Sequence, residues 1–129
     1  MAWSFSPHRP VYYQVAERIR RAILSGEYPS GAQIPSVRQL ALDAAVNPNT
    51  VQHAFSELEE LGLIESRGTV GRFVTENKEI IEKCRMQEAK ELVDGIINKV
   101  EELGINAEDI IRMIREHDSE AKEVHDEHS

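Results

Sequence analysis

The chain has 129 residues, of which 40% are hydrophobic, 29% are charged and only 5% are aromatic. This length and composition suit one modest, mainly aliphatic domain with an appendage, and exclude a large enzyme with a separate cofactor domain. The single cysteine, Cys84, excludes an internal disulfide and a cysteine-rich zinc site. Because no apolar run approaches membrane length and the start has no signal-peptide pattern, the sequence predicts a cytoplasmic protein without membrane contact.

The net charge of −8 by itself argues against a nucleic-acid partner. The charge is distributed unevenly, however. Residues 1–75 carry seven basic residues, all of them arginines, and seven acids, whereas residues 76–129 carry eight basic residues and sixteen acids. The sequence therefore predicts a neutral N-terminal segment and an acidic C-terminal segment with different electrostatic roles.

The first part of the chain predicts an arm followed by a helix. Residues 1–10 contain two prolines, Trp3 and Phe5 without a usable period, and predict an extended arm. Apolar residues recur at helical spacing from Val11, and Gly26 is placed to end this helix. Three arginines on the opposite face are interpreted as a solvated surface rather than as phosphate contacts: Arg18, Arg20 and Arg21. Residues 25–35 are rich in glycine and proline and predict a loop.

Two short helices are predicted next. Ser36 and Gln39 have the spacing of a capping box at the start of one helix. Asn47 is a favourable N-cap for the following helix, Pro48 fits its first position, and Gly62 follows its last apolar residue. Two short helices separated by a turn of a few residues predict a helix-turn-helix.

The β-prone runs 63–67 and 72–75 flank a glycine-bounded turn and predict a hairpin. The fold class is therefore mainly α with a small β-hairpin: a winged helix-turn-helix over residues 11–75, followed by two C-terminal helices over residues 76–116. The apolar faces of these two helices have few partners in so short a segment, so we expect them to form a dimer interface. Its predicted residues are Leu92, Val93, Ile96, Val100, Leu103, Ile110 and Ile114.

Residues 117–129 are nearly all polar or charged and predict a disordered acidic tail. His117, His125 and His128 lie there and could bind a metal, but an acidic tail without a metal is the simpler interpretation. Elsewhere no nucleophile–base pair, metal-ligand spacing or cofactor loop appears, so the sequence predicts neither an enzyme nor a cofactor.

The exposed side chains of the third helix are sorted along its length. Amide, hydroxyl and imidazole groups lie near its start (Asn47, Asn49, Thr50, Gln52 and His53), whereas its acids lie near its end (Glu57, Glu59 and Glu60). The second helix of a helix-turn-helix enters the major groove with its N-terminus first, so this order predicts contact with DNA. Asn49 and Gln52 can make bidentate contacts to adenine. For His53, DNA contact and plain exposure both remain open.

Other predicted DNA contacts lie outside that helix. Arg38 is in the first turn of the preceding helix, where it would contact phosphate or reach a guanine. Arg67, Gly68 and Arg72 lie on the hairpin; the glycine would let the backbone approach closely, and the arginines would enter the minor groove or grip phosphate.

Three runs resemble the GntR family of bacterial transcriptional regulators: Ile-Pro-Ser-Val-Arg-Gln-Leu-Ala at 34–41, Val-Asn-Pro-Asn-Thr-Val at 46–51 and Leu-Glu-Glu-Leu-Gly-Leu-Ile at 58–64. The second run, and a C-terminal segment of about two helices, are similar to the YtrA-like subfamily. The resemblance implies a DNA-binding regulator and points to Arg38 as a DNA contact. Two residues depart from the family: His53 stands where Lys or Arg is common, and Arg72 where a small hydroxyl residue is common. We therefore expect a shifted sequence preference.

The sequence thus predicts a homodimeric transcriptional regulator that acts by repression and binds a palindromic double-stranded DNA operator. An unidentified small-molecule effector would need a pocket at the dimer interface, because the chain lacks the additional effector domain of other GntR subfamilies. The alternative is a winged-helix adaptor whose acidic helices recruit a basic protein. An adaptor would not need acids kept away from the N-terminal half of its third helix.

Overall fold

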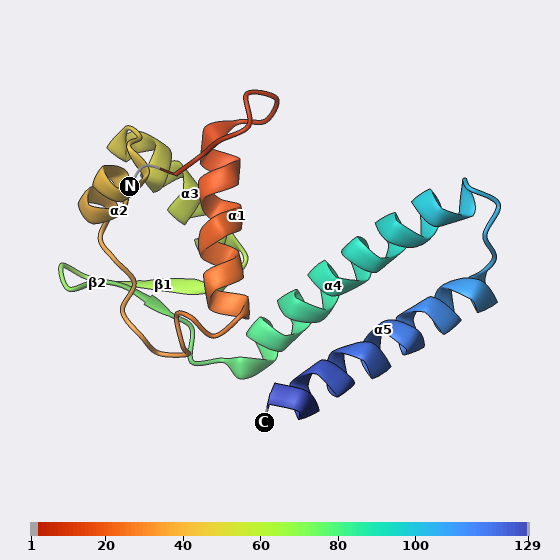
Figure 1. Cartoon of the computed structure of the whole chain (residues 1–129). Coiled ribbons are helices and arrows are strands. Elements are labelled where there is room, and N and C mark those ends of the chain that lie inside the picture. Colours follow the sequence, from red (N-terminus) through yellow and green to blue (C-terminus); the bar gives the residue numbers. More distant parts are fainter. Residues whose placement is uncertain (1–2, 129) are drawn as a thin grey trace. The chain divides into compact units, whose positions relative to one another are not determined.

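Helices α1, α2 and α3 and a two-stranded hairpin form the first of two units, Met1–Arg85 (Figure 1). In the computed structural model, which describes residues 3–128 and the side chains of residues 3–123, α1 is Val11–Leu24, α2 is Val37–Ala44 and α3 is Pro48–Glu60. Strands β1 (Ile64–Arg67) and β2 (Gly71–Val74) pair antiparallel, with Ile64 opposite Val74. The predicted order of helices and hairpin is confirmed.

Aliphatic side chains from α1 and α3 form the centre of the core. Six of them are at most 2% exposed: Val15, Ile19 and Ile23 of α1, and Val51, Phe55 and Leu58 of α3. Full burial of a side chain of this size contributes about 1.5–3 kcal/mol relative to leaving it in water. Several such residues on one face of α3 therefore determine which of its faces points outward.

Short polar side chains set where α2 and α3 begin. Asn47 caps α3, its Oδ1 accepting from the backbone N–H of Asn49 at 2.8 Å, as its sequence position predicts. Ser36 caps α2 by accepting from the N–H of Gln39 at 3.1 Å. The predicted capping box is only half formed, because the Gln39 amide donates to Asp43 one turn later at 2.8 Å instead of reaching back.

Part of the predicted loop joins the hairpin. The N–H of Val74 donates to the carbonyl oxygen of Ala32 at 2.8 Å, and the N–H of Ile34 donates to that of Arg72 at 2.9 Å. These bonds cover the outer edge of β2, whose backbone groups would otherwise lack partners. Earlier in the same loop Tyr28 packs against the core, and burial, followed by the carboxylates of Glu27 and Asp43, raises the pKa of its phenol.

The N-terminal arm is fastened to α1. Gln14 holds it through both ends of its amide: Oε1 accepts from the N–H of Ser6, and Nε2 donates to the carbonyl oxygens of Ser6 and Arg9, all within 2.9 Å. Trp3 packs against the core beneath the guanidinium of Arg18, 4.2 Å from its ring centre. Arg18 is exposed, as the sequence predicted, and its guanidinium also covers the Trp3 ring.

Helix α4 (Lys78–Glu101) begins in the first unit and continues into the second. Ile81 is buried and Cys84 packs against the core, while Arg85 Nε donates to the carbonyl oxygen of Leu24 at 3.0 Å. The first compact unit therefore extends beyond the predicted DNA-binding segment 11–75, to Arg85 inside α4. The reason is that the first turns of α4 carry apolar side chains that complete the core.

The second unit, Met86–Ser129, contains the rest of α4 and α5 (Ala107–His128), which runs back in the opposite direction after a turn (Figure 1). The tail from His117 was predicted to be disordered, but residues 117–123 continue α5. Charged pairs at helical spacing favour this helix: Lys122 Nζ lies 3.2 Å from Asp118 Oδ2. The side chains of His125 and His128 lie outside the described residues.

The second unit has little core of its own. Among residues 86–123, Ile110, one of the predicted dimer-interface residues, is the one buried apolar side chain. The remaining predicted interface residues are exposed or half-buried. In the part of the chain that the structure describes, no helix is both long and apolar enough to cross a membrane.

The turn between α2 and α3 contains one strained residue, Ala45, with a φ of 58°. The left-handed conformation costs an L-residue about 1–2 kcal/mol, whereas glycine adopts it freely but loses about 0.5–1 kcal/mol through greater freedom when unfolded. We therefore expect Ala45→Gly to raise the free energy of unfolding by about 0.5–1 kcal/mol in urea titrations. Ala45→Val is the matched control and should lower it. A destabilised Ala45→Gly variant would contradict this assignment.

Candidate nucleic-acid interface

The N-terminal half of α3 presents polar side chains to solvent. One side of the helix is buried through Val51, Ala54, Phe55 and Leu58. The opposite side therefore faces solvent. Of the predicted contact residues there, Asn47, Asn49, Gln52 and His53 are exposed and Thr50 is half-buried. The first turn of α3 contains no acid. The positive dipole end of α3 therefore faces solvent without a carboxylate in its first turn, while the N–H groups of Asn49 and Thr50 are already bonded to Asn47.

Residue His53 is held flat against α1. Its imidazole stacks on the ring of Tyr12, with ring centres 3.6 Å apart and planes only 9° from parallel. The sequence left the role of His53 open and did not suggest Tyr12 as its partner. The stack covers one face of the imidazole, so only its edges and its other face can meet a ligand.

Residue Arg72 lies across from α3 and contacts three of its residues. Its Nε donates to Glu59 Oε1 at 2.7 Å, its Nη2 donates to Gln52 Oε1 at 3.1 Å, and its guanidinium lies 4.7 Å from the ring centre of Phe55. Three-quarters of the Arg72 side chain is covered, since its exposure is 25%. The structure thus brings together two predicted site residues, Gln52 and Arg72, and adds Glu59, which the sequence had placed away from the site.

The side chain of Arg67 also contacts other side chains of the first unit. Its guanidinium is 4.3 Å from the ring centre of Phe73, and its Nη2 is 3.7 Å from Glu76 and 4.0 Å from Glu65. In the turn that follows, Gly68 is exposed with a φ of 54°, and a Cβ added there would meet nothing within 4 Å. The tip of the hairpin is therefore open to close approach, while the arginine beside it already has carboxylate neighbours.

The loop before α2 braces the hairpin. Gln33 Nε2 donates to the carbonyl oxygen of Val70 at 2.8 Å. A Cβ added at Gly71, whose φ is 132°, would lie 2.7 Å from that same nitrogen. Glycine is therefore required at this position for the brace to form. Sequence reasoning did not find Gln33, because its partner is 37 residues away.

In contrast, Arg38 points into solvent from the first turn of α2. Within the part of the chain that the structure describes, no hydrogen bond or ion pair of its side chain is found. Arg9 and Arg21 both pair with Glu17, and Arg72 pairs with Glu59. Arg38 is therefore a cation whose hydrogen-bonding capacity is available to a ligand.

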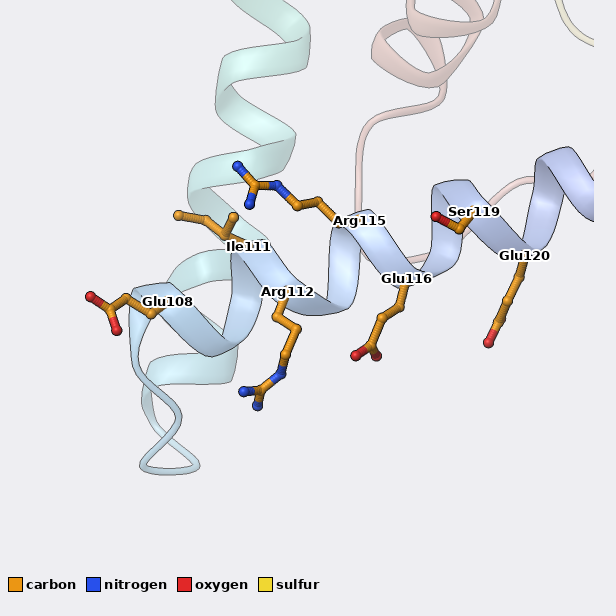
Figure 2. A pocket seen from close by; sticks show the side chains of 7 residues that line it. All are labelled: Glu108, Ile111, Arg112, Arg115, Glu116, Ser119 and Glu120. Atoms are coloured by element: carbon orange, nitrogen blue, oxygen red, sulfur yellow. The ribbon is translucent and has the colours of Figure 1, made fainter.

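The described residues form no metal-binding cluster, and the hollow along α5 is not an enclosed pocket. Among the described residues, no group of three His, Cys, Asp or Glu side chains is placed to hold a metal. Figure 2 shows a hollow along α5, open to solvent, with side chains that all come from this one helix: Glu108, Ile111, Arg112, Arg115, Glu116, Ser119 and Glu120. It contains both arginines and carboxylates, and Arg112 is paired with Asp109 at 2.8 Å. Such a surface resembles a solvated helix face more than an enclosed pocket.

A winged helix-turn-helix with an exposed polar start on its third helix defines the class of DNA-binding modules. The family model described as bacterial regulatory proteins, gntR family, matches residues 11–74. The chain belongs to the GntR family and is a transcriptional regulator with a GntR-type DNA-binding domain. Its fold and its relatives are those of transcriptional regulators.

The relatives extend beyond the DNA-binding domain. The HTH-type transcriptional repressor YtrA of Bacillus subtilis is 32% identical over 88% of this chain and 88% of its own. A GntR family regulator from Listeria monocytogenes has a similar structure, with a TM-score of 0.82 and 38% identity over 87% of this chain and 98% of its own. The DNA-binding domain of AraR, solved in complex with operator ORX1, has a TM-score of 0.54 and 28% identity over 58% of this chain and 95% of its own.

Proposed function

We propose that this chain is a homodimeric repressor that binds a palindromic DNA operator, with α3 of each copy in the major groove. The observation that carries the proposal is the exposed start of α3, which has no acid in its first turn, together with the exposed guanidinium of Arg38 on α2. The complex of the AraR DNA-binding domain with an operator supports DNA as the partner, and the repressor YtrA supports repression.

The proposed contacts divide into base readers and phosphate contacts. Asn49, Gln52 and the outer edge of His53 are placed on α3 to meet base edges, where amides make the most specific pairings. Asn47 and Thr50, at the helix start, and Gly68, at the open hairpin tip, suit phosphate through short side chains or backbone N–H groups. Arg38 is proposed to contact phosphate or a guanine. Arg67 would have to exchange its carboxylate neighbours for phosphate.

The second unit supports the proposed dimer. It exposes large apolar side chains that a solvated helix pair would not need, including Leu92 at 58% and Ile96 at 59% exposure. Together with Val93, Val100, Leu103 and Ile114 they form the proposed interface. A two-fold dimer presents the same DNA-binding surface twice. Its operator therefore contains the same half-site twice, as a palindrome, with the two half-sites about one helical turn apart. An effector at this interface would act by changing that spacing.

For DNA binding, Arg38→Ala is the sharpest single test. It removes an exposed cation without touching the core, so affinity for operator DNA should fall by about 1–3 kcal/mol while the melting temperature is unchanged. Binding is measured by fluorescence anisotropy at one fixed salt concentration. Arg21→Ala is the control, because it removes the same charge from a residue paired with Glu17 on α1. Equal losses in both variants, or none in either, would remove Arg38 from the interface.

For the dimer, Ile96→Glu should convert the protein to monomers at micromolar concentration, because a buried carboxylate without a partner is costly. Analytical ultracentrifugation measures the result. Asn98→Glu makes the same charge change at an exposed residue on the other side of α4, and this variant should remain dimeric. A wild-type protein that sediments as a monomer, or an Ile96→Glu variant that stays dimeric, would contradict the proposed interface.

A further inference from the structure

Arg72 lies on strand β2 and is engaged with the recognition helix. Its guanidinium reaches Gln52, Phe55 and Glu59 of α3. The carboxylate of Glu59 and the ring of Phe55 fix the guanidinium in place. One N–H of its Nη2 is thereby directed at the amide oxygen of Gln52, one of the proposed base readers.

The contact determines how the Gln52 amide is oriented. Arginine has five N–H donors and no acceptor, so it can bond only to the oxygen of a glutamine side chain. Gln52 Oε1 therefore accepts from Arg72 at 3.1 Å, and the Nε2 amino group is left as the donor that the exposed Gln52 side chain offers to a ligand. No rotation of the amide by 180° is compatible with this bond, because two donor groups would then face each other.

We propose that Arg72 acts as a positioning residue that makes Gln52 a hydrogen-bond donor and directs it to guanine. A free glutamine prefers adenine, where its oxygen accepts from N6 while its amino group donates to N7. Here that oxygen already accepts from a charged donor, and the adjacent positive charge opposes the approach of an adenine amino group. Guanine presents only acceptors, N7 and O6, in the major groove. The inference rests on the proposed DNA binding and adds the base that one side chain reads.

The test is selection of bound duplexes from a random DNA pool with the full-length wild type and with Gln52→Ala. The base pair whose preference disappears in Gln52→Ala is the one that Gln52 reads. We expect this pair to be G·C in the wild type, favoured about tenfold over A·T. An A·T pair at this position, or no position that depends on Gln52, would overturn the inference.

The role of Arg72 is tested in the same selection with Arg72→Thr, which restores the side chain common in the family. Releasing the amide should shift the Gln52-dependent position from G·C towards A·T. A purely structural role for Arg72 would weaken binding to all sequences without changing the preferred base. An unchanged preference for G·C would therefore overturn the positioning role.

Because Arg72→Thr removes contacts to α3, its folding is checked by circular dichroism and thermal melting. Gln52→Glu provides a second variant that keeps a bond to Arg72 but has no amino group to donate. It should lose the G·C preference, and a retained preference would contradict the inference even if Arg72→Thr fails to fold. Replacing the selected guanine by 7-deazaguanine should weaken the wild type several-fold and leave Gln52→Ala unchanged.

These outcomes separate the inference from the function on which it rests. If the wild type enriches no DNA sequence, the proposed DNA binding fails, and the inference fails with it. If the wild type enriches a defined operator but the Arg72 and Gln52 variants select the same bases, DNA binding stands and only the inference is overturned.

Discussion

The burial of one face of α3 is the constraint on which the other features depend. Val51, Ala54, Phe55 and Leu58 are all at most 1% exposed, and rotating the helix would bring several of them into water. At about 1.5–3 kcal/mol for each large side chain, that rotation would cost much of the stability of a small domain. The opposite face is consequently fixed towards solvent, and its polar residues are presented in a constant arrangement.

Two further contacts hold this helix at its flanks. Tyr12 stacks on His53 from α1, and Arg72 bonds to Gln52 and Glu59 from the hairpin. A specific binding surface needs side chains that are already ordered before the ligand arrives, because such side chains lose less entropy when they bind. The hairpin thus contributes to the surface through α3 as well as through its own open tip.

The charge of the chain illustrates why an average can mislead. The net charge of −8 resides entirely in residues 76–129, and the first 75 residues are neutral. Within that neutral segment the charges are not equivalent. Glu17 pairs with Arg9 and Arg21, and Glu59 pairs with Arg72, so these two acids are matched by arginines of the same unit. Arg38 remains outside these pairs.

Features that depend on neighbouring residues could be predicted from the sequence. The caps at Ser36 and Asn47, the apolar faces of the helices and the hairpin all rest on local chemistry or short periods, and the structure has them. Contacts between distant residues could not be predicted. Arg72 and Gln52 are 20 residues apart, so neither position identifies the other until the fold brings them together. The tail was misjudged because its composition is polar, although charged pairs one turn apart also favour a helix.

The most direct measurement is the affinity of the full-length chain for DNA from its own promoter region across a range of salt concentrations. If α3 and the arginine of α2 meet the duplex as proposed, the logarithm of the binding constant falls linearly with the logarithm of the salt concentration. DNA that contains the operator should then also bind at least about 10³-fold more tightly than unrelated DNA. Binding that is insensitive to salt, or no binding to any DNA, would contradict the account.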